Sequence, residues 1–474
     1  MREVSACPNR ILIAAPSSGG GKTTITCGLI AAMKRKGKHV VSFKCGPDYI
    51  DPMFHRQVLG IESGNLDTYF TDYDTTSYIL ANGSREADIT IIEGVMGYYD
   101  GLGGVSTTAS AYELARQTKT PVILVVDGKG SSVTLAALIN GIKNFRRDSG
   151  IAGVILNRVS KAYYSRIRDV ILAECKIPVL GFLPVMDSLT IPSRHLGLVA
   201  PEEVWEFDRW INDVCDAVCE NIDVDAVLEL AAGAQKLEYS AHRLPDNICN
   251  EERYKQGHIR IAVARDEAFS FYYAENIDIL ERLGAEIIYF SPLHDNKLPD
   301  NIHGLILWGG YPENYADKLS VNKSMRDSIY EACRDGMPCI AECGGFLYLG
   351  RRLEGTDGET YDMAGVLDGE GYRTARLVRF GYMEAKANGI HGGSSLLFGN
   401  DCHMRGHEFH YWDSTDCGSS FSAWKPLTPD KTYSCIIHTP SLIAGFPHFY
   451  YYSNPEAICS YIDKCKEYMH KNGR

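Results

Sequence analysis

Short apolar runs alternate with amphipathic stretches along most of the chain. In the first half the runs are 10–15, 39–44, 88–93, 121–127, 152–157 and 178–183. Continuous apolar runs of this length are typical of parallel strands that helices cover on both faces. The stretches 23–37 and 131–147, which lie between runs, have the spacing of helices. The pattern predicts a parallel α/β fold for this half.

A second series of runs follows a polar segment. Residues 201–236 have the pattern of an acidic amphipathic helix, whereas 237–257 are polar, lack periodicity and contain a proline, which is typical of a linker. Apolar runs resume at 259–266, 286–291, 304–310 and 338–342, and beyond about 355 we expect mixed loops and strands. A chain of 474 residues is too long for one core. We expect two α/β domains, 1–236 and 258–474, joined by the linker 237–257.

The composition of the chain limits the classes of molecule that we expect it to bind and the compartment in which we expect it. The net charge of −12 disfavours nucleic acid and anionic membranes as partners. No apolar run approaches the length of a membrane span, and the first residues do not resemble a secretory signal, so we expect a cytoplasmic protein. The 15 cysteines are scattered without a Cys-x-x-Cys pair, which favours reduced thiols over disulfides or zinc. A homodimer is compatible with these features.

The segment AAPSSGGGKTT (14–24) has the form of a phosphate-binding loop between a strand and a helix. Gly19, Gly20 and Gly21 let backbone N–H groups face a phosphate, and the helix N-terminus attracts the same charge. Lys22 can reach the β- and γ-phosphates of ATP, and Thr23, followed by Thr24, can ligate Mg²⁺. Pro16 replaces the usual first glycine, which is tolerable because the N–H groups nearer the lysine hold the anion.

Mg²⁺ also needs carboxylates, and two stand at predicted strand ends. Asp48 follows the run 39–44, and Glu93 ends the run 88–93. Asn157 ends the run 152–157, where it could bind a purine edge or cap a loop. Ser17 stands where partitioning ATPases carry an additional lysine, which weighs against a motor protein.

A second chemical motif is PCIAECGGFLYLG (338–350), in which an apolar strand leads through Glu342-Cys343-Gly344-Gly345 into a helical stretch. This is the form of a nucleophile elbow. We expect the helix N-terminus to lower the pKa of the Cys343 thiol. Gly309 and Gly310 follow a strand in GLILWGGYPE, so with Gly344 they are candidates for an oxyanion hole and glutamine contacts. His407 and His410 could serve in packing or in substrate contacts.

Eight blocks occur together and in order: KCGPDYIDPMFH, NLDTYF, IEGVMGYYDG, GVILNRV, IPSRHLGL, GGYPE, AECGGFLYLG and RGHEFHY. Through them the chain resembles the cobyrinate a,c-diamide synthase family over nearly its full length. Nickel-sirohydrochlorin a,c-diamide synthase is a close relative with the same blocks. The resemblance implies an N-terminal P-loop ligase domain, similar in fold to dethiobiotin synthetase, and a C-terminal class I glutamine amidotransferase domain.

The resemblance also implies residue roles. Lys22 and Thr23 would bind ATP and Mg²⁺, Asp48 and Glu93 would bind Mg²⁺, and Cys343 would be the nucleophile with His448 as its base. The usual Pro-Glu after the histidine is replaced by Phe449-Tyr450, so the sequence assigns no third member to the Cys–His pair.

The implied substrates are ATP, L-glutamine and cobyrinate or a related tetrapyrrole polycarboxylate. The implied reaction is amidation of the a and c carboxylates through an acyl phosphate, in cobalamin biosynthesis. Amidation of a nickel sirohydrochlorin, in the coenzyme F430 pathway, is the alternative, and a non-enzymatic P-loop partitioning or regulatory protein is a more distant one. A basic side chain in a loop or at a strand end is, taken singly, more simply a surface charge than a substrate contact, and Arg194 and His195 are the favoured candidates for contacting the tetrapyrrole. The full set of candidates is Tyr49, Asp51, His55, Lys129, Arg194 and His195.

Overall fold

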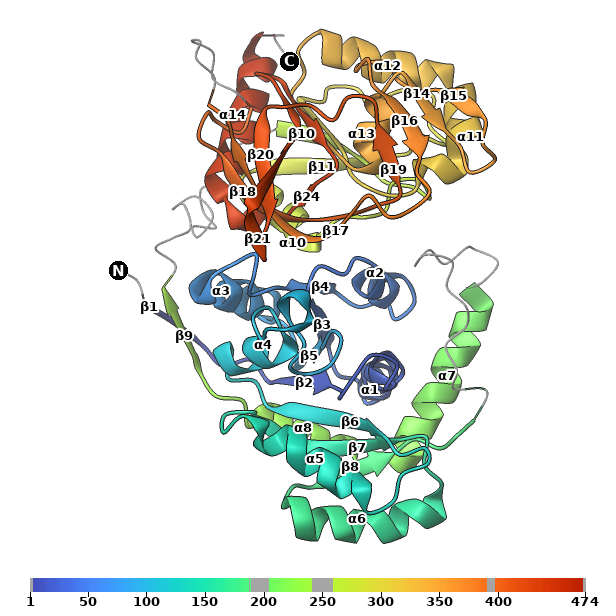
Figure 1. The fold of residues 1–474 in the computed structure, drawn as a ribbon, viewed down its shortest axis with the longest axis vertical. Helices are drawn as coiled ribbons and strands as arrows, with labels where there is room; N and C mark the ends of the chain where they lie inside the picture. Colours follow the sequence, from blue (N-terminus) through green and yellow to red (C-terminus); the bar gives the residue numbers. More distant parts are fainter. Residues whose placement is uncertain (1–2, 187, 189–203, 241–258, 390–396, 472–474) are drawn as a thin grey trace. The chain divides into compact units, whose positions relative to one another are not determined.

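The computed structural model describes residues 3–186, 188, 204–240, 259–389 and 397–471 (Figure 1). The chain divides into two compact units, Met1–Arg243 and Leu244–Arg474. Each unit has its own central sheet, so the two units are described separately. None of the helices in these ranges is both long and apolar enough for a membrane crossing.

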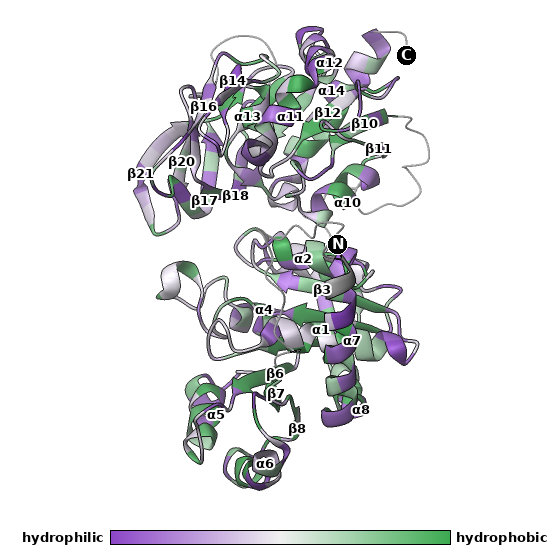
Figure 2. Cartoon of the chain, turned by 90° about the vertical axis from the view of Figure 1, so that its right-hand side faces the viewer, coloured by the Kyte–Doolittle hydropathy of each residue, from purple (hydrophilic) through white to green (hydrophobic). Residues whose placement is uncertain are grey.

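The first unit is built on a seven-stranded parallel sheet with the order β4-β3-β5-β2-β6-β7-β8. Its strands are almost entirely buried, and Figure 2 shows β6 and β7 in the green of hydrophobic residues. This confirms the predicted α/β class and the six predicted runs. The strands are β2 Arg10–Ala14, β3 Val40–Cys45, β4 Ser63–Leu66, β5 Ile89–Glu93, β6 Val122–Asp127, β7 Ile151–Asn157 and β8 Val179–Phe182.

Helices connect these strands, and short polar side chains begin several of them. Asp72, Ser110, Ser160 and Asp223 each accept a hydrogen bond from a backbone N–H in the first turn of a helix, which satisfies a donor that has no partner within the helix. The helices are α1 Lys22–Arg35, α2 Ile50–Gln57, α3 Tyr73–Gly83, α4 Ala111–Gln117, α5 Thr134–Phe145, α6 Lys161–Cys175, α7 Val204–Asn221 and α8 Val224–Ala232, with the 3-10 turn η1 Leu102–Gly104.

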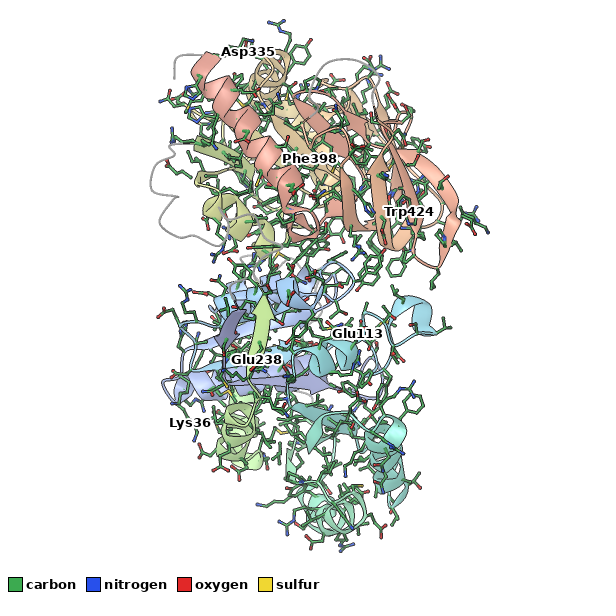
Figure 3. The ribbon with its side chains drawn as sticks, turned by 90° about the vertical axis from the view of Figure 1, so that its left-hand side faces the viewer. Lys36, Glu113, Glu238, Asp335, Phe398 and Trp424 are labelled. Atoms are coloured by element: carbon green, nitrogen blue, oxygen red, sulfur yellow. The ribbon has the colours of Figure 1, made fainter. Side chains whose placement is uncertain are left out.

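Helix α1 carries the phosphate loop and is held against α7 and α8. A Cβ on Gly28 would lie 2.7 Å from Val214 and 2.6 Å from Val218, so glycine permits the close approach of α1 and α7 that Figure 1 shows. At the far end of α1, Arg35 pairs with Asp216, and Lys36, labelled in Figure 3, pairs with Asp225. The acidic stretch predicted as one helix over 201–236 therefore contains two helices that cover α1.

A two-stranded antiparallel sheet joins the ends of the first unit. Strand β1, Glu3–Ala6, pairs with β9, Leu237–Ser240. The first four residues of the expected linker 237–257 are thus a strand, and the remainder lies outside the described residues. Strand β4 was also absent from the predicted runs, because Ser-Gly-Asn-Leu has no apolar pattern although all four residues are buried.

The second unit contains a six-stranded sheet with the order β11-β10-β12-β13-β23-β22. Its strands are parallel except for β22 at one edge, which is antiparallel to β23. The strands are β10 Ile259–Ala264, β11 Ala285–Phe290, β12 Gly304–Leu307, β13 Cys339–Glu342, β22 Ile437–His438 and β23 Leu442–Gly445. The helices of this unit are α10 Ala274–Arg282, α11 Ala316–Val321, α12 Lys323–Arg334, α13 Gly344–Leu349 and α14 Pro455–Lys471, with the turns η6 Pro312–Tyr315 and η7 Tyr451–Ser453.

The region after 350 forms two further sheets, as the expectation of mixed loops and strands allowed. One has the order β15-β14-β16-β19 and the other the order β21-β20-β17-β18-β24. The last of these strands, β24, carries His448 and pairs with β18. The bounds are β14 Arg352–Glu354, β15 Thr360–Asp362, β16 Glu370–Arg373, β17 Arg379–Ala387, β18 His403–His410, β19 Trp412–Ser414, β20 Phe421–Lys425, β21 Thr428–Cys435 and β24 His448–Phe449.

Candidate active sites

The glycine run 19–21 forms the connection between β2 and α1. Gly19 and Gly21 have φ angles of +74° and +96°, a region that glycine enters without steric cost. A Cβ on Gly21 would lie 2.1 Å from Asn157 Nδ2, so glycine also lets the loop pass the end of β7. Gly21 is the N-cap residue of α1 and has no side chain to cap it. The first N–H groups of this helix can therefore face an anion.

Lys22 begins α1, and its ammonium group folds back over the loop. Its Nζ donates to Ser17 O at 3.2 Å and to Met96 O at 2.5 Å. Burial lowers the pKa of Lys22, and the neighbouring Lys44 lowers it further. Lys22 thus lies beside the loop in which the phosphates of a nucleotide would be held.

Thr23 and Glu93, two of the three predicted metal ligands, are in direct contact. Thr23 Oγ1 donates to Glu93 Oε1 at 2.7 Å. The phosphate loop follows β2 and Glu93 ends β5, and these two strands are neighbours in the parallel sheet, so the loop and the acid meet at the same sheet edge. A hydroxyl and a carboxylate beside a phosphate loop fit Mg²⁺, which completes its shell with water and phosphate oxygens. Within the described ranges no three His, Cys, Asp or Glu side chains are arranged as a metal site by themselves.

Lys44 on β3 occupies the centre of a buried group of carboxylates. Its Nζ lies 2.6 Å from Asp51 Oδ2, 3.0 Å from Glu93 Oε1 and 4.0 Å from Asp48 Oδ2. Lys44 and Glu93 are paired in the register of β3 and β5, so sheet topology fixes the contact. We call Lys44, Asp48, Asp51 and Glu93 the lysine–carboxylate cluster.

The charges of this cluster are mutually dependent. Burial raises the pKa of Asp48 to about 6, and Asp51 raises it while Lys44 opposes the change. Burial likewise raises the pKa of Glu93 against the effect of Lys44. Burial alone would lower the pKa of Lys44, but Asp51 and Glu93 raise it overall. Lys44 is therefore a charged counterion whose removal would leave buried acids uncompensated.

The other residues predicted to contact a substrate lie in different environments. His55 is fully buried, with Nδ1 3.0 Å from Ser42 Oγ and Nε2 3.5 Å from Glu93 Oε2, so it lies behind Glu93 rather than at a surface. Tyr49 is partly buried before α2 and Lys129 is exposed after β6. Arg194 and His195 lie outside the described residues. Thr24 is partly buried in the first turn of α1. Asn157 Nδ2 donates to Gly20 O at 3.1 Å, so this side chain contacts the loop, and its predicted contact with the purine of ATP stays a prediction.

In the second unit, Cys343 lies at the turn between β13 and α13. Its φ and ψ angles are +48° and −105°, a conformation that costs energy for any residue with a Cβ. Cys343 N donates to Gly445 O at 2.8 Å, which ties the turn to β23. A strained residue between a parallel strand and a helix is the geometry of a nucleophile elbow.

The glycines around Cys343 permit close packing. A Cβ on Gly345 would lie 2.0 Å from Leu307 O, and one on Gly344 would lie 3.0 Å from Gly310 N. The backbone N–H of Gly310 is therefore next to the elbow, as an oxyanion donor would need to be. A Cβ on Gly309 would lie 2.1 Å from His448 Cε1, so this glycine makes room for the imidazole.

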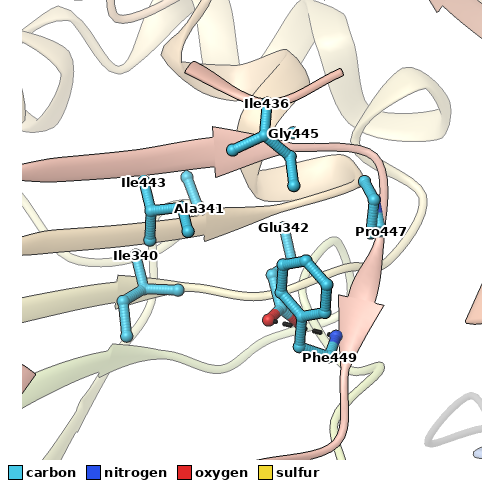
Figure 4. Close-up of a pocket in the computed structure, with 8 residues that line it drawn as sticks. All are labelled: Ile340, Ala341, Glu342, Ile436, Ile443, Gly445, Pro447 and Phe449. Atoms are coloured by element: carbon cyan, nitrogen blue, oxygen red, sulfur yellow. Dashed lines mark hydrogen bonds between the residues drawn. The ribbon is translucent and has the colours of Figure 1, made fainter. Parts of the chain in front are cut away.

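His448 is buried on β24 and has a carboxylate beside it. Its Nδ1 lies 4.0 Å from Glu342 Oε2. The other oxygen of Glu342 accepts a hydrogen bond from Phe449 N at 3.3 Å. Figure 4 shows this bond and the small pocket that Glu342 and seven largely apolar neighbours line.

Electrostatics at this site differ from the sequence expectation. Burial raises the pKa of the Cys343 thiol, Glu313 raises it further, and the opposing effect of Gly344 N–H is smaller. The expectation that the helix would lower this pKa is therefore wrong, because desolvation exceeds the effect of a short helix. Burial lowers the pKa of His448 to about 3, with further contributions from His407 and His410. The imidazole is thus neutral and able to accept a proton.

Two acidic residues of this site were not singled out from the sequence. Burial raises the pKa of Glu313, in η6, to about 7, and burial raises that of Glu342 well above its ordinary value. Both lie within quoted motifs, GGYPE and AECGGFLYLG. The signal that could have identified them is an acidic residue at the point where an apolar strand passes into a turn. His407 is the register partner of His448 in the pairing of β18 with β24. The ring of His410 instead stacks on the ring of Phe446, with 3.9 Å between the ring centroids.

Comparisons with known proteins cover both units. The CobQ/CobB/MinD/ParA nucleotide binding domain family matches residues 11–199, and the CobB/CobQ-like glutamine amidotransferase domain family matches residues 260–437. The cobyrinate a,c-diamide synthase of Priestia megaterium is 37% identical over 465 residues, covering 96% of this chain and 97% of that protein. The protein of the same name from Listeria innocua is 39% identical, covering 95% and 98%. That from Salmonella typhimurium is 40% identical, covering 96% and 98%.

Proposed function

The chain belongs to the cobyrinate a,c-diamide synthase family, and from this membership we propose that it amidates the a and c carboxylates of cobyrinate with nitrogen from glutamine and energy from ATP. It is an enzyme, a carbon–nitrogen ligase with glutamine as amide donor. The observation that supports the proposal most strongly is the pairing of two sites in one chain. One is a phosphate loop with Lys22, Thr23 and Glu93, and the other is a nucleophile elbow with Cys343 and His448.

At the elbow, the proposed reaction is hydrolysis of glutamine. His448 accepts the Cys343 proton, and the sulfur attacks the amide carbon of glutamine to form a C–S bond. The C–N bond then breaks, and the leaving nitrogen takes the proton from His448 to depart as ammonia. Water cleaves the resulting thioester, which releases glutamate and restores the thiol. The N–H of Gly310 is the candidate donor to the oxyanion.

Glu313 is the candidate residue for binding the α-ammonium group of glutamine. Glu313 is buried and close enough to Cys343 to raise the pKa of its thiol, and no ion pair joins its carboxylate to a Lys or Arg of the described residues. A buried carboxylate without a cation is costly. A substrate that carries an ammonium group would supply that cation and would place its amide near the thiol.

In the first unit, the proposed reaction activates the acceptor. A carboxylate oxygen of cobyrinate attacks the γ-phosphorus of ATP, ADP leaves, and an acyl phosphate forms. Ammonia then attacks the acyl carbon, phosphate leaves, and an amide results. Lys22 would stabilise charge on the transferred phosphoryl group. Bound to Thr23 and Glu93, Mg²⁺ would neutralise phosphate charge, and Lys44 would hold the acids in position.

A labelling experiment tests this function. The full chain is incubated with ATP, Mg²⁺, amide-¹⁵N-glutamine and either cobyrinate or nickel-sirohydrochlorin, and the products are analysed by mass spectrometry. We expect labelled diamide from cobyrinate, none without ATP, and little from the nickel substrate. Efficient amidation of nickel-sirohydrochlorin alone would instead assign the enzyme to that substrate, and amidation of neither would refute the proposal.

A further inference from the structure

The chain provides a nucleophile and a base but no acid at the usual place after the base. The residues that follow His448 are Phe449 and Tyr450, both buried. A histidine that accepts a proton in a buried site becomes an imidazolium, which needs a carboxylate to orient and stabilise it. The structure must supply that group from another element.

Glu342, the residue before the nucleophile, is in this position. It ends β13, and its two carboxylate oxygens face the two residues of β24: Oε1 accepts from Phe449 N at 3.3 Å, and Oε2 lies 4.0 Å from His448 Nδ1. Successive side chains of a strand point to opposite faces, and the positive φ of Cys343 turns the chain immediately afterwards. Adjacent residues can therefore approach the same imidazole from different sides.

The surroundings of Glu342 strengthen this contact. The pocket in Figure 4 is lined otherwise by residues without ionisable side chains, including Ile340, Ile436, Ile443 and Pro447. Apolar walls lower the local dielectric and increase the interaction between a carboxylate and a nearby cation. The carboxylate oxygen of Glu342 that does not accept from Phe449 N is Oε2, and this oxygen faces the imidazole of His448.

We propose that Glu342 is the positioning residue for His448: it holds Nδ1, leaves Nε2 for the Cys343 proton, and stabilises the imidazolium that forms. This inference rests on the proposed glutamine hydrolysis at Cys343. The proton moves from the Cys343 sulfur to Nε2 and later to the departing nitrogen, and Glu342 takes no proton from the imidazole. The positive charge of the imidazolium offsets the burial that raises the pKa of Glu342, so the carboxylate form is favoured while the imidazolium exists. Its role is therefore electrostatic and orientational, and no covalent bond to it forms.

Glu342 acts on the thiol in two opposing ways. Its negative charge directly disfavours a thiolate at Cys343, whereas its attraction for the imidazolium favours transfer of the proton to His448. The proposal requires the second effect to be larger, because Oε2 is adjacent to the imidazole. Other ionisable groups also face the site, and they remain unchanged in the Glu342 variants; they are His407, His410 and Glu408 of β18, Tyr311, Glu313 of η6 and Tyr451 of η7.

The test compares Glu342→Gln with Glu342→Asp in the full chain. The amide of Glu342→Gln can still accept from Phe449 N but carries no charge. Two properties are measured: glutaminase kinetics, and the pH dependence of Cys343 alkylation by iodoacetamide, located by mass spectrometry. Glu342→Gln should lower kcat for glutamine by about 100-fold with little change in KM, and should move alkylation to higher pH. Glu342→Asp should recover part of both.

Two control variants show how the pH dependence of Cys343 alkylation responds when a different carboxylate is removed. Glu313→Gln removes a carboxylate beside the thiol that is not paired with His448, so it should move alkylation to lower pH. Glu286→Gln removes an exposed acid of β11 and should change neither property. Thermal unfolding of each variant checks that the second unit is folded.

The outcomes separate this inference from the proposed function. Alkylation of Glu342→Gln at the same or lower pH than wild type would overturn the inference, because Glu342 would then be only a nearby charge. Should Glu342→Gln fail to fold, a wild-type kcat in Glu342→Asp combined with an unchanged alkylation profile would overturn it as well. Absence of glutaminase in the wild type would refute the proposed function, while the alkylation profiles would still test the Glu342–His448 contact.

Discussion

The two sites differ in whether their buried carboxylates have a cation of the protein beside them. In the first unit, Lys44 lies within 4.0 Å of three carboxylates, so the acids of the phosphate site have a cation from the protein. In the second unit, Glu313 and Glu342 are buried, and no Lys or Arg of the described residues pairs with either. Both acids have a raised pKa because of burial.

The difference indicates what each site binds. A site whose charges already compensate one another is stable before its ligands arrive. Phosphates and Mg²⁺ that bind there must replace contacts that the charged side chains of the protein make with one another. A site with carboxylates that lack a cation is suited to positive groups that arrive during the reaction. Glutamine brings an ammonium group, and proton transfer creates an imidazolium.

The largest effect is expected from removing the sulfur nucleophile. Cys343→Ser should lower glutamine-dependent amidation by at least about 10⁴-fold, because a hydroxyl in this setting is a far weaker nucleophile than a thiolate. Amidation supported by high ammonium should persist, since the first unit is unchanged. Product formation from each nitrogen source measures the two activities. Equal loss of both would mean that the two sites do not function separately.

Removing the cation of the lysine–carboxylate cluster should destabilise the first unit. Lys44→Met leaves the buried acids Asp51 and Glu93, and the partly buried Asp48, without their cation, and we expect a loss of about 3–5 kcal/mol in the free energy of unfolding. The acids can be protonated at low pH, so the loss should be smaller at about pH 5 than at about pH 8. Chemical denaturation at the two pH values measures this.

Lys36 offers a matched control for that variant. Lys36, labelled in Figure 3, also pairs with an acid, Asp225, but both of these side chains are exposed. Lys36→Met should change stability by less than about 0.5 kcal/mol. An equally small effect of Lys44→Met would contradict the contrast between the two units.

Lys22→Ala should uncouple the two reactions. The variant lacks the ammonium group held over the phosphate loop, and amidation should fall by about 100-fold or more from lost stabilisation of phosphoryl charge. Glutaminase should continue, because Cys343 and His448 belong to the other unit. Parallel assays of amide product and glutamate follow the two reactions, and undiminished amidation would refute the role of the loop.

Much of this arrangement could be predicted from the sequence. The apolar runs identified six of the seven strands of the first sheet and four of the six strands of the second sheet, because residues covered on both faces must be apolar over their whole length. Strands β22 and β23 lie in the region where only mixed loops and strands were expected. The glycines next to Lys22 and next to Cys343 indicated the phosphate loop and the nucleophile elbow, because glycine allows the tight backbone turns that both require. Strand β4 escaped prediction because a short buried strand of Ser-Gly-Asn-Leu carries no hydrophobic period.

Contacts between distant residues could not be predicted in the same way. The position of Lys44 between Asp51 and Glu93 depends on the register of β3 with β5. That Glu342 faces His448 depends on β24 folding back over the elbow. The raised pKa of Cys343 depends on how completely the site is buried, which a motif alone does not state.

The smallest effect concerns the affinity for glutamine and its dependence on pH. Burial raises the pKa of Glu313 to about 7, so this carboxyl is neutral below about pH 7 and charged above it. If it binds the ammonium group of glutamine, KM should fall as pH rises through about 7. In Glu313→Gln, KM should be about tenfold higher than wild type at about pH 8, nearly equal to it at about pH 6, and almost independent of pH. Exposed Glu331 on α12 supplies the control Glu331→Gln, which should keep the wild-type slope. A Glu313→Gln variant with that same slope would show that the acid beside the thiol is not the partner of the substrate cation, and the contrast between the two sites would then rest on Glu342 alone.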